Sequence, residues 1–151
     1  MHDSLEQFLR CAARLEADAA EGYDTLAATI GRERYPEVHA LFERFAGFSR
    51  MHLHEVLEIQ RRELGRGFDV GGESFDWPDG LSPENPLAVV ELEGITPERA
   101  LEHALEVERR ACDFYAHVAG RTRSPRVQQL AHEFAEEESA HVDHLERWLG
   151  R

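Results

Sequence analysis

The sequence predicts an all-α protein, an antiparallel four-helix bundle with a long crossover between its second and third helices. One observation is that apolar residues recur every three or four positions along four segments, as they do on the buried face of a helix. A second is that these segments form two pairs with nearly the same residue pattern, an internal repeat of two helix pairs. A third is that residues 65–96, between the pairs, are rich in the glycine and proline that break long helices.

The first two helices are expected at about residues 4–31 and 36–64. Ser4, with Gln7 three residues later, has the capping-box pattern that opens a helix. Pro36 suits the first turn of the second helix, because the amide hydrogen that proline lacks has no partner there in any case. Each helix then carries one apolar stripe and one polar face, which indicates that one side of it is buried.

Residues 65–96 are expected to form the crossover. Connections this long are uncommon in compact domains, but joining two helical hairpins into this bundle needs a connection that runs the length of the bundle. Apolar side chains within the segment are expected to pack it against the helices. They are Phe75, Trp77 and the run from Leu87 to Val90.

The third and fourth helices are expected at about residues 97–120 and 125–149. At the start of each, a residue that caps helices comes directly before a proline suited to the first turn. These pairs are Thr96-Pro97 and Ser124-Pro125. The result is a second helical hairpin that matches the first.

The composition predicts one soluble globular domain over residues 1–151, with 42% apolar and 31% charged residues. No stretch approaches the roughly 18 uninterrupted apolar residues of a membrane span, so no membrane association is expected. The segment from Met1 to Glu6 lacks the basic start and apolar middle of a signal peptide. We therefore expect a cytoplasmic location.

The charge and the cysteines exclude two further classes of function. A formal net charge of -13 would repel a phosphate backbone, so nucleic-acid binding is not expected. Cys11 and Cys112 are the only cysteines and lie far apart in the sequence. Neither a disulfide framework nor a thiolate metal site is therefore indicated, and both cysteines are expected to pack as small apolar residues.

The two helix pairs repeat a chemical pattern as well as an apolar one. Each pair carries a glutamate and, seven residues later, a tyrosine on its first helix, and a histidine on its second helix, seven residues after the phenylalanine of a Phe-Ala dipeptide. In the first pair these residues are Glu16, Tyr23 and His52, and in the second they are Glu108, Tyr115 and His141. Facing helices of a four-helix bundle build two-metal sites from carboxylates and imidazoles in this way.

The second pair also contains Glu138, three residues before His141, so both side chains share one helix face. An isolated Glu-x-x-His is weak evidence in an acidic chain. Here, however, the glutamates and histidines fall within apolar stripes, and burying carboxylates without partners is costly. A divalent cation would compensate for that cost. The alternative is that the helical phase is wrong by one position and the glutamates are solvated, which their heptad spacing to the tyrosines argues against.

These residues give the chain a resemblance to a known family. The segments "LEVERRACDFYAHVAG" and "FAEEESAHVDHLERWL", with the matching first half, resemble the ferritin-like superfamily and most closely the di-iron domain of rubrerythrins. The resemblance covers nearly the whole chain and implies an iron cofactor of two ions, with manganese or zinc as other possible metals. It implies that the terminal ligands are Glu16 and Glu108, that His52 and His141 each complete the shell of one metal, and that Glu138 bridges.

Ser49 occupies the position of the other bridging glutamate, and a hydroxyl is a far weaker ligand for iron than a carboxylate. Either both ions are held with an added water, hydroxide or other anion, or one position fills poorly. The ion nearer Glu108 is then expected to be the tighter. Glu55 and His54 are the candidates that would compensate, but Glu55 lies on the wrong side of His52 for the family's geometry and His54 points to another face.

The tyrosines have two interpretations. Tyr23 and Tyr115 are expected on the same faces as Glu16 and Glu108, where they can hydrogen-bond metal ligands from outside the coordination sphere. Alternatively, they are core tyrosines whose hydroxyl groups reach some local partner.

The resemblance implies a non-haem di-iron oxidoreductase, a peroxidase that reduces peroxide or a protein that reacts with dioxygen. Full-length rubrerythrins carry a rubredoxin domain with Cys-x-x-Cys pairs, and this chain has none, so an external electron donor is expected. Ala111 stands where the peroxidase-type site has an extra glutamate, which puts the family's redox-linked ligand exchange in doubt. The alternatives are an iron-binding protein without turnover and a scaffold with a degenerate site. A homodimer is also expected from the resemblance.

Overall fold

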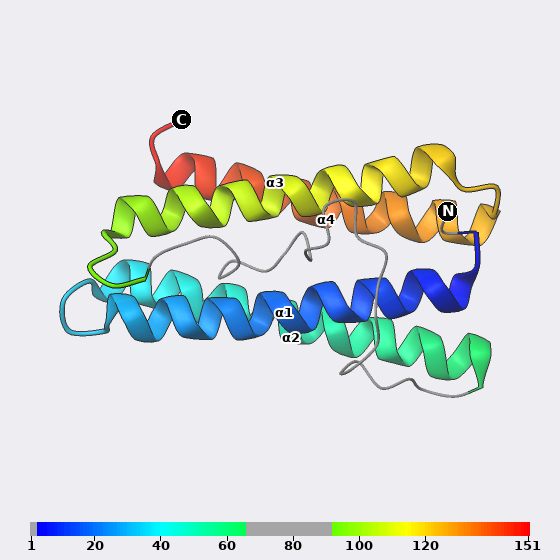
Figure 1. Ribbon diagram of the computed structural model, residues 1–151, viewed down its shortest axis with the longest axis horizontal. Coiled ribbons are helices and arrows are strands. Elements are labelled where there is room, and N and C mark those ends of the chain that lie inside the picture. The colour runs from blue at the N-terminus through cyan, green and yellow to red at the C-terminus, as the bar shows by residue number, and fades with distance from the viewer. Residues whose placement is uncertain (1–2, 66–91) are drawn as a thin grey trace.

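The structure is a computed structural model that describes residues 3–65 and 92–151. Within these two segments the chain forms four α-helices and is all-α, as predicted (Figure 1). The helices are α1 (Leu5–Ile30), α2 (Pro36–Leu64), α3 (Pro97–Arg121) and α4 (Pro125–Trp148). Most of the predicted crossover, including Phe75, Trp77 and Leu87 to Val90, lies outside the described residues.

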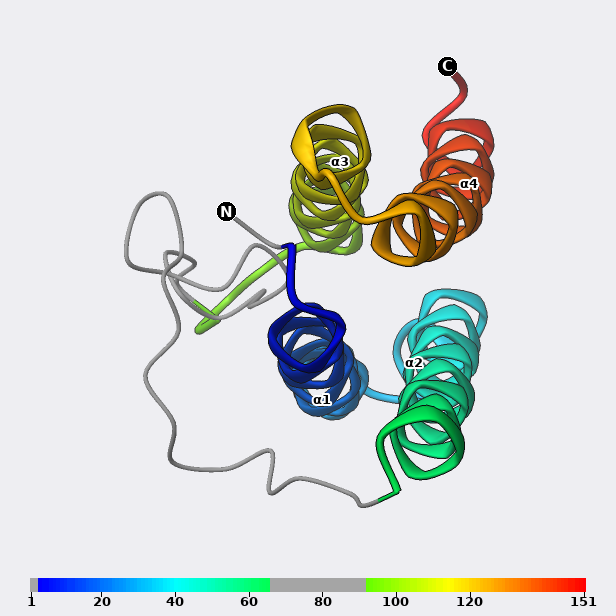
Figure 2. The ribbon, with the colours of Figure 1, turned by 90° about the vertical axis from the view of Figure 1, so that its right-hand side faces the viewer.

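The helices are arranged as two antiparallel hairpins, α1 with α2 and α3 with α4, that pack into a four-helix bundle (Figures 1 and 2). Helix α2 ends at the opposite end of the bundle from the start of α3, so the chain between them links the two ends, as predicted for a crossover. The two helices of each hairpin approach each other more closely than the hairpins do. Larger side chains can therefore be accommodated between the hairpins.

The helix starts follow from the capping residues that the sequence contains. Three helices begin with a hydroxyl that accepts a hydrogen bond from a backbone amide three residues later, an arrangement worth about 1 kcal/mol at each helix. The pairs are Ser4 with Gln7 at 3.3 Å, Thr96 with Arg99 at 3.2 Å and Ser124 with Val127 at 3.2 Å. Helix α2 has no side-chain cap and begins directly at Pro36, where the missing amide hydrogen leaves nothing to satisfy.

The core consists of two apolar clusters with a polar layer between them. In α1, Leu15 belongs to the first cluster and Ala19 to the second, and Glu16 lies between them. The other helices repeat this order, with a buried polar residue between a member of each cluster. These residues are Ser49 and His52 in α2, Glu108 in α3 and Glu138 in α4. Burial of the flanking side chains thus places the predicted ligands together in the middle of the bundle.

Within residues 3–65 and 92–151, no helix has both the length and the apolar character needed to cross a membrane.

Candidate metal centre

The three glutamates of the polar layer are buried. Glu16 is 2% exposed, Glu108 is 3% exposed and Glu138 is 1% exposed. The alternative in which a shifted helical phase leaves them in solvent is therefore wrong. One glutamate each comes from α1, α3 and α4, so both hairpins contribute carboxylates to one small volume.

Glu16, His52 and Glu138 form the first ligand cluster. Their potential ligand atoms lie within 4.8 Å of one another, close enough to surround one metal ion. Nδ1 of His52 lies 2.6 Å from Oε1 of Glu16, and this buried hydrogen bond links α2 to α1. All three side chains are buried, so an ion held here would be shielded from bulk water.

Glu108, Glu138 and His141 form the second ligand cluster, again with potential ligand atoms within 4.8 Å of one another. Nδ1 of His141 lies 3.5 Å from Oε2 of Glu138 and 3.6 Å from Oε2 of Glu108. The His141 side chain is only partly buried, and its ring stacks on Phe48 at a centroid distance of 5.8 Å. Glu138 belongs to both clusters, which places it between two adjacent candidate ion positions.

Two carboxylate oxygens in the clusters have unsatisfied hydrogen-bonding capacity that a metal ion could use. Oε2 of Glu108 and Oε2 of Glu138 are buried and have no hydrogen-bond partner among the described residues. A buried carboxylate oxygen without a partner is costly, and a cation between the two oxygens would remove the cost. Carboxylate and imidazole ligands suit iron, manganese and zinc. The residues present therefore fit a divalent metal, although they do not select one.

Tyr23 supports the second cluster from the other hairpin. Its hydroxyl, on α1, donates a 2.6 Å hydrogen bond to Oε1 of Glu108, on α3. This leaves Oε2 as the Glu108 oxygen that faces the ligand cluster. Tyr23 is fully buried, so the contact is not exchanged with water. Of the two interpretations of Tyr23, the one in which it holds a candidate ligand agrees with this geometry.

Tyr115 is also fully buried, within a group of aromatic rings. It makes edge contacts with Phe8, Phe114 and Phe134 at centroid distances of 6.1, 5.5 and 5.4 Å. Phe134 also contacts the His52 ring, at 4.5 Å. Tyr115 thus packs beside the first ligand cluster as part of the apolar core.

Replacing Tyr23→Phe should weaken metal binding without removing it. Groups that orient a metal ligand typically contribute about 10–100-fold to affinity, and the lost hydroxyl also leaves Oε1 of Glu108 unpaired. We expect the affinity for one of two ions to fall by about tenfold and the metal-free protein to lose about 1–3 kcal/mol of stability. Metal titration and urea unfolding measure the two effects. Tyr35→Phe, at the partly exposed start of α2, is the matched control and should change neither.

The electrostatics of the two clusters favour bound protons in the metal-free protein. Burial lowers the pKa of His52, but its hydrogen bond to Glu16 and the nearby carboxylates outweigh burial and raise it to about 9. For His141, burial is likewise outweighed by Glu108 and Glu138, and the pKa rises to about 10. Burial and the charge of Glu138 raise the pKa of Glu108 to about 8. Burial also raises the pKa of Glu16.

The stability of the metal-free protein should fall as the pH rises. A histidine whose folded pKa lies above its ordinary 6.5 stabilises the fold below pH 6.5 and loses that contribution as the pH passes 9 to 10. Glu108 acts in the same direction, because ionising it between pH 4.5 and about 8 costs more in the folded protein. Calorimetry with chelator present should show a lower Tm at about pH 9.5 than at about pH 6.5, with about 2–4 °C lost per kcal/mol. His141→Gln should make the Tm depend less on pH. A wild-type Tm that is the same at both pH values would contradict the raised pKa values of the histidines and Glu108.

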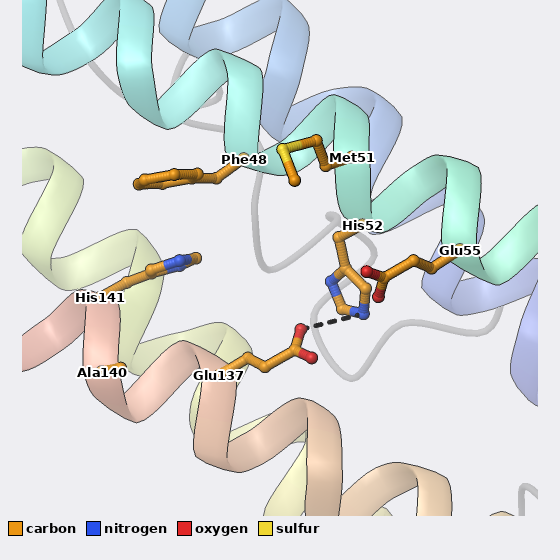
Figure 3. Close-up of a pocket in the computed structure, with 7 residues that line it drawn as sticks. All are labelled: Phe48, Met51, His52, Glu55, Glu137, Ala140 and His141. Atoms are coloured by element: carbon orange, nitrogen blue, oxygen red, sulfur yellow. Dashed lines mark ion pairs between the residues drawn. The ribbon is translucent and has the colours of Figure 1, made fainter.

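On the outer side of His52 lies Glu137, which is not among the ligands predicted from the sequence. Nε2 of His52 faces Glu137, with 3.3 Å to Oε2, and Glu55 lies beside them (Figure 3). Glu55 therefore sits on the far side of His52 from Glu16, as its position in α2 predicts, and it is not part of the two inner clusters. Glu137 precedes His141 by one helical turn, a spacing that the sequence shows but that does not distinguish Glu137 from the other glutamates around Glu138.

Ser49, Ala111 and Cys112 complete the surroundings. Ser49 is 5% exposed and lies one turn before His52 on α2, within the polar layer. Ala111 is fully buried one turn after Glu108. Cys112 is partly buried, and its thiol donates a hydrogen bond of 3.5 Å to the carbonyl of Ala135. Cys112 belongs to no ligand cluster among the described residues.

Comparison with known proteins supports the fold. No protein-family model matches the chain, and no curated protein matches it significantly. It is similar to the 2.00 Å crystal structure of an uncharacterized conserved protein from Magnetospirillum magnetotacticum MS-1. The two structures superpose with a TM-score of 0.78 over 97% of this chain and 94% of that chain, at 28% sequence identity. The likeness therefore extends over the whole bundle.

Proposed function

We propose that the protein binds two iron ions in the polar layer and acts as a non-haem di-iron oxidoreductase of rubrerythrin type, which reduces peroxide. The observation that carries this proposal is the position of Glu138, buried and common to two three-residue ligand clusters. Glu16 and His52 would hold one ion, Glu108 and His141 would hold the other, and Glu138 would contact both.

The surrounding residues would exclude bulk water from this site, hold a ligand in place and leave one side open to a small substrate. When bound, two ferrous ions supply the two electrons that reduction of hydrogen peroxide to water consumes. The apolar clusters on both sides of the layer exclude bulk water, and Tyr23 holds Glu108 in place. His141, partly exposed beside an open pocket, lies on the side that a small molecule such as peroxide can reach. We propose that an external electron donor reduces the oxidised iron again, as residues 1–151 contain no Cys-x-x-Cys pair for a redox centre of their own.

Anaerobic loading with ferrous iron followed by hydrogen peroxide tests the proposal. Each peroxide should oxidise two ferrous ions and take up two protons to give two waters, and a chemical reductant should then allow repeated turnover. Oxidation should be much faster than that of ferrous iron in buffer. Iron that binds but oxidises no faster than in buffer would overturn the proposed oxidoreductase activity.

Ser49 favours a second candidate, an iron-binding protein without turnover. The polar layer of the described residues supplies three buried carboxylates, whereas the resemblance to rubrerythrins implies four. With less negative charge, the layer would hold ferrous iron yet stabilise its oxidised form less. Stoichiometric binding without accelerated oxidation supports this candidate. A Tm that does not change on adding metal would instead point to a degenerate site, since binding to the native state adds stability.

A further inference from the structure

His52 presents its two ring nitrogens to different groups of carboxylates. Nδ1 points inward and lies 2.6 Å from Oε1 of Glu16. Nε2 points outward and lies 3.3 Å from Oε2 of Glu137 (Figure 3). The ring thus stands between the buried polar layer and the outside of the bundle.

On the outer side, His52, Glu55 and Glu137 form a third ligand cluster, with potential ligand atoms within 4.8 Å of one another. The two glutamates are exposed, and they come from α2 and α4, which belong to different hairpins. The cluster lines an open pocket of about 250 Å³ (Figure 3). The two carboxylates are therefore open to an ion arriving from solvent, and they lie beside the buried Nε2 of His52.

The lack of a hydrogen-bond partner at Nε2 is a second observation that indicates a ligand. His52 is 6% exposed, yet its buried Nε2 has no hydrogen-bond partner among the described residues. The 3.3 Å contact with Glu137 is an ion pair that lacks the geometry of a hydrogen bond. A nitrogen and an oxygen at this separation can instead both contact one cation, because metal–ligand bonds of about 2.0–2.2 Å at right angles put two ligand atoms about 3 Å apart.

We propose that His52, Glu55 and Glu137 form an outer site for a divalent cation, which loads the buried centre. A neutral imidazole has one lone pair, so His52 can coordinate through Nε2 or through Nδ1 but not through both. With an ion at Nε2, the proton is on Nδ1 and is donated to Glu16. With an ion at Nδ1, the proton is on Nε2 and faces Glu137. The outer and inner ions therefore use His52 in turn.

Charge favours the outer position as the first to be filled. Two carboxylates balance one divalent cation, and both are accessible to solvent. The chain carries a formal net charge of -13, which attracts cations to its surface. Binding at the outer site stands on its own residues, whereas the loading role rests on the proposed inner centre.

Titration with Mn²⁺ at fixed pH, followed by the electron paramagnetic resonance signal of the free ion, tests the outer site. Glu138→Gln disables the residue common to both inner clusters and should leave one weakly bound Mn²⁺. Adding Glu55→Gln and Glu137→Gln to this variant should remove that ion. The control adds Glu43→Gln and Glu136→Gln instead, which removes two charges from α2 and α4 outside the pocket. This variant should still bind the weak Mn²⁺. Retained helical circular dichroism confirms that each variant is folded.

The outcomes separate the outer site from the inner centre. If Glu138→Gln binds no Mn²⁺, or binds it equally well without Glu55 and Glu137, the outer site is overturned. If the wild-type protein binds one Mn²⁺ that depends on Glu55 and Glu137 alone, the outer site stands and the inner centre fails. The loading role predicts that Glu55→Gln with Glu137→Gln keeps the wild-type Mn²⁺ stoichiometry but slows uptake about tenfold, the lower end of what focused charge contributes to association. Unchanged uptake would overturn that role.

Discussion

Replacing Glu138→Gln should remove tight binding of both ions from the metal centre. Glu138 is the one residue that both inner clusters share, and glutamine keeps its size while removing the charge. Groups that only orient a metal ligand contribute about 10–100-fold to affinity, so loss of a shared ligand should cost at least about 100-fold. Elemental analysis after dialysis should show two ions per chain for the wild type and none for the variant. Any remaining weak binding belongs to the outer site.

The same variant should lose the stabilisation that metal confers. At a metal concentration about 100 times the dissociation constant, binding adds about 2.7 kcal/mol, or roughly 5–10 °C in Tm for a chain of this size. Glu136→Gln is the matched control, because it removes an exposed carboxylate two residues away on the same helix. It should retain both ions and the full Tm increase. A Glu138→Gln protein with two tightly bound ions would contradict the assigned centre.

Replacing Ser49→Glu should strengthen binding of the second ion. Ser49 is buried in the polar layer and shares a face of α2 with His52, so a carboxylate there adds a ligand and a negative charge between the hairpins. Affinity for the weaker ion should rise about 10–100-fold, the range in which supporting groups commonly act. Without metal, the new carboxyl group should remain protonated and, as a buried polar group, cost about 1–3 kcal/mol. Titration with ferrous iron under anaerobic conditions measures the gain, and urea unfolding with chelator measures the cost.

The Ser49→Gln variant distinguishes the effect of a new metal ligand from the effect of a larger side chain. It places a side chain of similar volume at the same position but offers no carboxylate, so it should lose stability through overpacking and gain no metal. A Ser49→Glu protein that behaves like Ser49→Gln would show that residue 49 does not face the ions. The proposed difference between this centre and that of rubrerythrins would then need another explanation.

The helices and the inner clusters could be predicted because both follow from local periodicity. A glutamate within an apolar stripe, such as Glu16 or Glu108, is carried into the core by its flanking residues. Three helix starts could likewise be predicted from the capping residue at each of them. Gly120, by contrast, was expected to end the third helix, which continues to Arg121. Helix ends vary by one or two residues, so a glycine alone does not specify the last residue of a helix.

Contacts between the two hairpins could not be predicted in detail. The sequence predicts Tyr23 on the same face of its helix as Glu16 but not which ligand its hydroxyl meets, and that hydroxyl reaches Glu108 on the other hairpin. Glu137 lies beside the apolar stripe, where a residue is ordinarily solvated, and only the position of α2 beside α4 brings it to His52. The helical period specifies which face of a helix is buried. It does not specify which residues of two facing helices meet.

The polar layer between the two apolar clusters has a consequence for how the hairpins dock. Each hairpin buries apolar side chains at both ends of its inner face, so hydrophobic contact alone would tolerate several axial alignments. Sliding one hairpin by a helical turn, about 5.4 Å, would move Glu108 and Glu138 against apolar side chains and separate Tyr23 from Glu108. We therefore expect the polar layer to fix the axial register of the bundle, as a single polar pair does in coiled coils. The residues that would bind metal would also prevent the two halves of the chain from docking out of alignment.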